Sequence, residues 1–173
     1  MRLLSKCVMP LVIISMVACH SSQTETKNGV ATIEGMKVDS STGLTAKYTG
    51  IEPGKIFLMM NGEVLNHTDI PIGDSFTIVN QNPKGFVVKF GNISLGCSLL
   101  IEDSTGKKIL SKPDLFSKNN LIDEANATLL TCNVPTNDSM KWEERYKVTV
   151  VFWDKYGNGK IENTVTFRSI DIP

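Results

Sequence analysis

Apolar and polar residues alternate with a period of two along most of the chain after residue 30. This alternation is typical of strands that bury one face and leave the other in water. Strands are therefore predicted wherever the alternation persists. The segments that show it are 30–38, 44–49, 55–60, 76–78, 86–90, 93–101, 107–110 and 127–134.

Two adjoining segments near the carboxyl terminus carry the strongest pattern, which predicts a hairpin. Its turn is expected over residues 154–159. The residues predicted to face inward are Tyr146, Val148, Val150 and Phe152 on the first strand, and Ile161, Val165 and Phe167 on the second. A second, tighter turn is predicted at Asn61-Gly62, because this dipeptide suits a type I′ turn in which both central residues have positive φ.

Two stretches break the alternation and are predicted as long loops, over residues 111–124 and 135–144. The first is expected to contain a helical turn near residues 121–125. No segment has a helical period long enough for an independent helix.

Short strands separated by Gly, Asn and Asp turns indicate an all-β fold, an antiparallel β-sandwich over residues 30–173. An immunoglobulin domain would show Cys, then Trp, then Cys, whereas both tryptophans here follow Cys97 and Cys132, so the expected architecture is Ig-like without being a true Ig domain.

The amino-terminal residues differ from the rest of the chain. Arg2 and Lys6 precede an apolar run over residues 8–18, which is too short to span a bilayer comfortably. The run ends at Met16-Val17-Ala18-Cys19, which resembles the lipobox of bacterial lipoproteins. This resemblance implies a signal peptide over residues 1–18, lipid on Cys19, and anchoring of the mature protein to a membrane. Residues 19–29 lack an apolar pattern and are predicted to form a flexible tether.

The whole chain resembles the small β-sandwich lipoproteins of Bacteroidota, mainly through the lipobox and, to a lesser degree, through the hairpin turn around residues 153–161. The resemblance implies an envelope location and no known reaction. Acidic residues that accompany surface export in that group are missing directly after Cys19, where the first acid is Glu25. We therefore expect an outer-membrane protein that faces the periplasm rather than the cell surface.

Charge argues against a nucleic-acid partner. The full chain carries 18 basic and 18 acidic residues. Removal of residues 1–18 takes away Arg2 and Lys6 and no acid, which leaves a net charge of −2 (0 − 2). Nucleic acid requires a basic excess, so the expected partners are the membrane, through Cys19, and an envelope protein or glycan.

Two cysteines remain once Cys7 is removed with the signal peptide and Cys19 is modified. Strand periodicity points both Cys97 and Cys132 toward the core. They either form a disulfide, which an extracytoplasmic compartment permits, or remain buried thiols that pack as small apolar side chains.

Trp142, Trp153 and Tyr156 are candidates for a binding surface near the last hairpin. The alternative is that Trp153 packs on the sheet beneath the 135–144 loop. The turn from Asp154 to Gly159 resembles part of a calcium loop, but it offers only two of the four side-chain ligands that an EF-hand uses. No metal or cofactor is expected.

No catalytic residue is predicted. His67 is the only histidine outside the tether, and no nucleophile motif accompanies it. The preferred function is a non-enzymatic binding or assembly module of the cell envelope. The alternatives are a hydrolase acting on glycan or peptide, and a structural subunit of an envelope complex.

Overall fold

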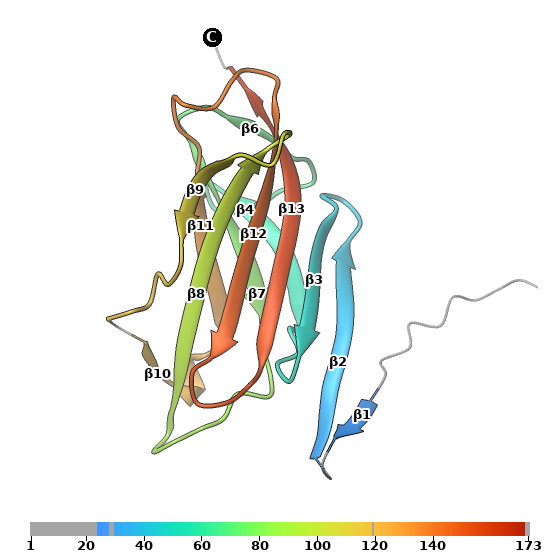
Figure 1. Cartoon of the computed structure of the whole chain (residues 1–173), viewed down its shortest axis with the longest axis vertical. Helices are drawn as coiled ribbons and strands as arrows, with labels where there is room; N and C mark the ends of the chain where they lie inside the picture. Colours follow the sequence, from blue (N-terminus) through green and yellow to red (C-terminus); the bar gives the residue numbers. More distant parts are fainter. Residues whose placement is uncertain (1–23, 28–29, 119, 172–173) are drawn as a thin grey trace, which may run out of the picture.

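Two antiparallel β-sheets pack against each other and form a β-sandwich (Figure 1). The computed structural model describes residues 24–27, 30–118 and 120–171. The fold class predicted from the alternation of apolar residues is therefore confirmed. Within the described residues the sole helical segment is a short 3-10 turn, η1, at Glu124–Asn126.

The larger sheet has nine strands and carries the last hairpin at its centre. Its order is β1-β2-β3-β13-β12-β8-β10, with β6 added in parallel to β13 and β9 added to β8. The bounds are β1 Thr24–Lys27, β2 Val30–Asp39, β3 Leu44–Thr49, β6 Asp69–Pro71, β8 Asn92–Asp103, β9 Lys108–Lys112, β10 Leu121–Asp123, β12 Arg145–Asp154 and β13 Lys160–Ile170.

The smaller sheet has four strands in the order β11-β7-β4-β5. Their bounds are β4 Lys55–Met60, β5 Glu63–Val64, β7 Ser75–Gln81 and β11 Leu129–Pro135. The Asn61-Gly62 turn that joins β4 to β5 has φ values of 52° and 85°, as the type I′ prediction requires.

The core lies between the sheets and consists of the residues predicted to face inward. Tyr146, Val148, Val150 and Phe152 of β12 are all buried, as are Ile161, Val165 and Phe167 of β13. Phe167 connects the two layers, because its ring centroid lies 5.4 Å from that of Phe76 in β7. Burial of this apolar surface is the main force that holds the two sheets together.

Three predicted elements differ from the structure. Residues 86–90 form a loop instead of a strand, because Phe90 adopts a positive φ of 52° in a turn and the segment pairs with neither sheet as a strand. The predicted 111–124 loop is shorter, since β9 extends to Lys112 and residues 121–123 form β10 against β8. Residues 24–27, in the predicted tether, form β1 against β2.

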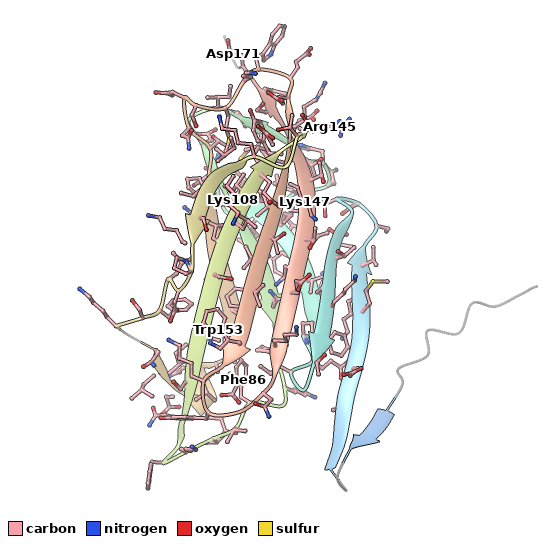
Figure 2. The ribbon with its side chains drawn as sticks, viewed as in Figure 1. Phe86, Lys108, Arg145, Lys147, Trp153 and Asp171 are labelled. Atoms are coloured by element: carbon pink, nitrogen blue, oxygen red, sulfur yellow. The ribbon has the colours of Figure 1, made fainter. Side chains whose placement is uncertain are left out.

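At one end of the sandwich, several turns lie close together. A row of directly paired residues in the larger sheet marks where this end begins. The row crosses the larger sheet through Glu34, Thr49, Lys160, Trp153 and Gly96. We use the name loop end for the turns beyond this row, which are residues 50–54, 82–91, 124–128 and 154–159. Figure 2 shows Phe86 and Trp153 toward the loop end and Arg145, the first residue of β12, toward the opposite end.

Candidate functional site

A buried carboxylate organises the loop end. Asp154 is only 3% exposed and terminates β12. Its Oδ2 accepts a hydrogen bond from the backbone N–H of Val87 at 2.7 Å, and its Oδ1 accepts one from that of Tyr156 at 2.8 Å. The residue that began the calcium-like pattern therefore serves as an acceptor that ties the 82–91 loop to the hairpin turn.

The next residue ties a second loop to the same turn. The Lys155 Nζ lies 2.7 Å from Asp114 Oδ2 and 3.1 Å from the carbonyl oxygen of Phe116. Burial acts to raise the pKa of Asp114, but hydrogen bonds from Lys155 and from the backbone N–H of Phe116 hold that pKa below its usual value. Asp154 and Lys155 thus fix two loops relative to one hairpin.

The 82–91 loop is also fixed to the strand connection before β4. The backbones of Lys84 and Glu52 exchange two hydrogen bonds of 2.9 Å. Gly85 approaches Gly50 so closely that a Cβ at position 85 would lie 2.1 Å from the Gly50 carbonyl oxygen, and its φ is +102°. Only glycine fits this position without a shift of the backbone.

An open groove lies between the 82–91 loop and the segment that contains η1. We call it the end groove; its volume is about 680 Å³. Its apolar lining consists of Pro83, Phe86, Val88, Ile93 and Ala127. Lys84 and Glu124 contribute one charge of each sign. A concave, mainly apolar surface with a few polar groups is the usual form of a ligand site.

The Phe90 turn, residues 89–92, projects from the same loop. The backbones of Lys89 and Asn92 form two hydrogen bonds of 2.9 and 3.0 Å, and the two residues between them, Phe90 and Gly91, have φ values of 52° and 75°. Asn, Asp and Gly normally occupy such positions, because a bulky side chain in the left-handed region costs about 1–3 kcal/mol. The Phe90 side chain is nevertheless fully exposed.

The three aromatic residues predicted as one surface do not come together. Trp142 precedes β12 by three residues and is 64% exposed, whereas Trp153 is the ninth residue of β12. Trp153 lies eight residue steps, or about 27 Å, along β12 from its first residue, Arg145, and Trp142 lies before that residue. Trp153 packs on β8, since a Cβ on Gly96 would lie 2.1 Å from its ring, so the 135–144 loop does not cover it.

Tyr156 belongs to the loop end and contacts the Phe90 turn. The Lys89 Nζ lies 4.6 Å from the centroid of the Tyr156 ring. A cation at this distance from an aromatic face is attracted to it. The contact supports the Phe90 turn from the side of the β12–β13 hairpin.

Cys97 and Cys132 face each other across the sandwich, from β8 in one sheet and β11 in the other. Both are buried free thiols, and their side chains are within hydrogen-bonding reach. This hydrogen bond, followed by burial, raises the pKa of Cys97, so its thiol stays protonated. The structure confirms that both side chains point into the core.

Other candidate residues lie away from the end groove. His67 is exposed, and its Nδ1 accepts a hydrogen bond from the Asp69 backbone at 3.3 Å. Cys19 lies outside the described residues. Within the described part of the chain, no cluster of three or more His, Cys, Asp or Glu side chains is placed to hold a metal ion, and no helix could cross a bilayer.

The alternation of apolar and polar residues predicts neither the end groove nor the Phe90 turn. The two-residue spacing of Phe86, Val88 and Phe90 predicts one face of a strand. The sequence Phe90-Gly91-Asn92 indicates a turn instead of a strand, because glycine and asparagine favour turns. The groove itself depends on loops that are distant in sequence.

Comparison with known proteins supports the architecture alone. No known protein family matches the chain, and no curated protein does. Among solved structures, the chain is similar to the C-terminal domain of wzt, with a TM-score of 0.50 and 8% sequence identity. The alignment covers 81% of this chain and 80% of that domain. At this identity the likeness concerns the fold.

Proposed function

We propose that this protein is a non-enzymatic binding module of the cell envelope, held at a membrane by lipid on Cys19. The observation that carries the binding role is the end groove. The wall formed by the 82–91 loop is fixed by Asp154 and by the Lys84–Glu52 backbone pair, and a hydrogen bond from the Glu124 amide to the Gly91 carbonyl joins it to the wall that contains η1, so the groove is formed without a ligand. A preformed groove binds more tightly because less conformational freedom is lost on binding.

The lining indicates the class of ligand. Five apolar side chains and only two charged ones line the groove, and the charges have opposite sign. This composition suits an amphiphile of the envelope that places an acyl chain or a similarly apolar segment in the groove. Hydrolysis of a glycan would require two carboxylates a few ångströms apart, and Glu124 is the one carboxylate of the lining.

The binding role can be tested with dansylundecanoic acid, a fluorescent fatty acid. The described fold begins at Thr24, so a chain without residues 1–19 retains every described strand and avoids competition from its own acyl chains. We expect saturable binding that is at least tenfold weaker in Val88→Asp, because this variant places a charged carboxylate against the apolar chain of the ligand. Val88 is 38% exposed, which limits the effect of its substitution on folding.

Val64→Asp is the matched control, since Val64 is 61% exposed in β5, at the opposite end of the smaller sheet. It should leave the affinity unchanged. Failure of the unaltered chain to bind, or equal weakening in both variants, would remove the groove as the basis of the function.

A further inference from the structure

The strongest unexplained feature of the surface is the Phe90 turn. Phe90 occupies a backbone conformation that favours Asn or Gly, and its whole ring is exposed. Neither property contributes to the stability of the sandwich. Val87 and Val88, beside it in the loop, are also exposed apolar residues. A turn that combines backbone strain with apolar exposure is expected to contact something outside the domain.

The turn is held in place rather than left loose. Asp154 binds the Val87 amide at 2.7 Å, the Lys89 amino group lies over the Tyr156 ring, and the Gly91 carbonyl accepts a hydrogen bond from Glu124 at 3.0 Å. Three contacts from two elements, the β12–β13 hairpin and η1, therefore support the loop on both sides of Phe90. The ring projects from a fixed platform, which reduces the entropy lost when it is buried.

The Phe90 turn and the beginning of the described chain lie at the same end of the larger sheet. In the row that crosses this sheet, Glu34 of β2 and Gly96 of β8 are aligned. Val30, the first residue of β2, and Asn92, the first residue of β8, each lie four residues beyond that row in the direction of the loop end. Figure 1 shows both strands starting at this end.

The length of the chain before β1 limits where a membrane can lie. Five residue steps separate Cys19 from Thr24, and a fully extended chain covers at most about 17 Å over that length. Thr24 pairs with Ile33, three residues inside the end of β2, a distance of about 10 Å along the strand. The chain is therefore long enough for a lipid on Cys19 to lie in the plane of the loop end, the end that also carries the Phe90 turn.

We infer that the Phe90 turn inserts its aromatic ring into the bilayer that holds the lipid on Cys19, so that the loop end faces the membrane. This inference rests on the proposed lipid anchor. The two contacts lie on opposite sides of the larger sheet, at β2 and at β8, and together they fix the orientation of the body. The end groove then opens beside the lipid, where an amphiphilic ligand would enter it.

The charges of this region favour a neutral interface. Lys84 and Lys89 are near the turn, but Asp123 and Glu124 lie in the adjoining segment, and all four side chains are exposed. With both signs present, insertion depends on apolar contact, so it should not require anionic lipid or weaken with salt.

The test uses the full mature lipidated protein in phosphatidylcholine vesicles, with or without brominated acyl chains that quench nearby tryptophan. Phe90→Trp places a probe at the turn, and Val64→Trp places one at the opposite end of the smaller sheet; Trp142 and Trp153 give the same background in both. We expect brominated lipid to quench at least half of the added emission of Phe90→Trp and none of that of Val64→Trp. Equal emission with and without bromine in Phe90→Trp would overturn the inference.

A second variant covers the case in which Phe90→Trp folds poorly. Phe90→Asn creates Asn-Gly, the preferred type I′ dipeptide, so this variant should melt at the same temperature as the parent or higher. Hydrogen exchange over residues 84–92 should slow on vesicles in the parent protein and not in Phe90→Asn. Equal slowing in both would also overturn the inference.

The two failures can be distinguished. Protein that does not remain with the vesicles indicates failure of the lipid anchor, whereas protein that remains but whose tryptophan is not quenched indicates failure of the Phe90 contact.

Discussion

At the scale of single residues, the contact between Trp153 and Gly96 explains why a large aromatic side chain is tolerated on the outer face of the sheet. The two residues are directly paired between β12 and β8. The indole ring lies over the glycine, where any Cβ would come within 2.1 Å of it. A tryptophan packed in this way contributes to stability and is only partly accessible to a ligand.

Gly96→Ala should therefore lower the free energy of unfolding by about 1–3 kcal/mol, the usual cost of forcing extra volume into a packed site. The measurement is urea denaturation. In a Trp153→Ala background the same substitution should cost much less, because the clashing ring is gone. A cost that is equal in both backgrounds would show that the ring is not what excludes the methyl group.

Single-residue burial was largely predictable, and single-residue contacts were not. Alternation alone placed Phe152, Val165 and Cys97 in the core, because a strand sends successive side chains to opposite faces. It placed Trp153 on the outer face for the same reason. The partner of Trp153 depends on the register between β12 and β8, which are about 50 residues apart in sequence, so no local pattern encodes it.

At the scale of elements, the turn after β12 holds the loop that forms one wall of the end groove. Asp154→Ala removes the acceptor for the Val87 and Tyr156 amides. Loss of a buried, charged acceptor should lower the free energy of unfolding by about 1–3 kcal/mol. Amide exchange over residues 86–91 should also increase, because the loop loses its attachment.

Asp138→Ala is a suitable control for this substitution, since Asp138 is exposed in the loop at the opposite end. It should change neither stability nor exchange in the 86–91 loop. If Asp154→Ala behaves like Asp138→Ala, the carboxylate does not organise the loop end.

The structure has Cys97 and Cys132 as free thiols, and we expect their oxidation to a disulfide that joins the two sheets when the protein is made in an oxidising compartment. The thiols are within hydrogen-bonding reach from opposite sheets, and a bond would close a loop of about 35 residues (132 − 97). In the chain-entropy model, such a loop adds about 4 kcal/mol to the free energy of unfolding. Thiol titration of unfolded, non-reduced protein from the envelope should find neither cysteine free, and two free thiols would rule the bond out.

Strands were predicted correctly where the alternation of apolar residues was long. The prediction was wrong where a short apolar segment was compatible with either a strand or a turn. The β12–β13 hairpin and the strand at residues 44–49 match the prediction because several consecutive residues agree on one period. Phe86, Val88 and Phe90 gave only three positions, and turn formation at Gly91 prevailed over the apparent period. The strand β10 has only three residues and no alternation of apolar and polar positions, and it forms by pairing with an existing edge of β8.

At the scale of the whole molecule, the sandwich was predictable and its assembly was not. Many short strands with turn residues between them indicate two packed sheets. The order of the strands depends on pairings such as Thr45 with Thr164, which join segments 119 residues apart (164 − 45). That order places the Phe90 turn, the end groove and β1 at the same end, so the surface proposed to bind the ligand and the membrane could not be predicted from local sequence.

We propose that a lipid on Cys19 holds this sandwich at an envelope membrane. Intact-mass spectrometry of the protein purified from membranes of the native host tests it most directly, with Cys19→Ala as the variant that cannot accept the lipid. We predict a chain that begins at Cys19 and carries a diacylglyceryl group with additional acylation, and no lipid mass on the variant. A chain from the membrane fraction that begins at another residue, or that begins at Cys19 with no added lipid, would rule out the lipid anchor.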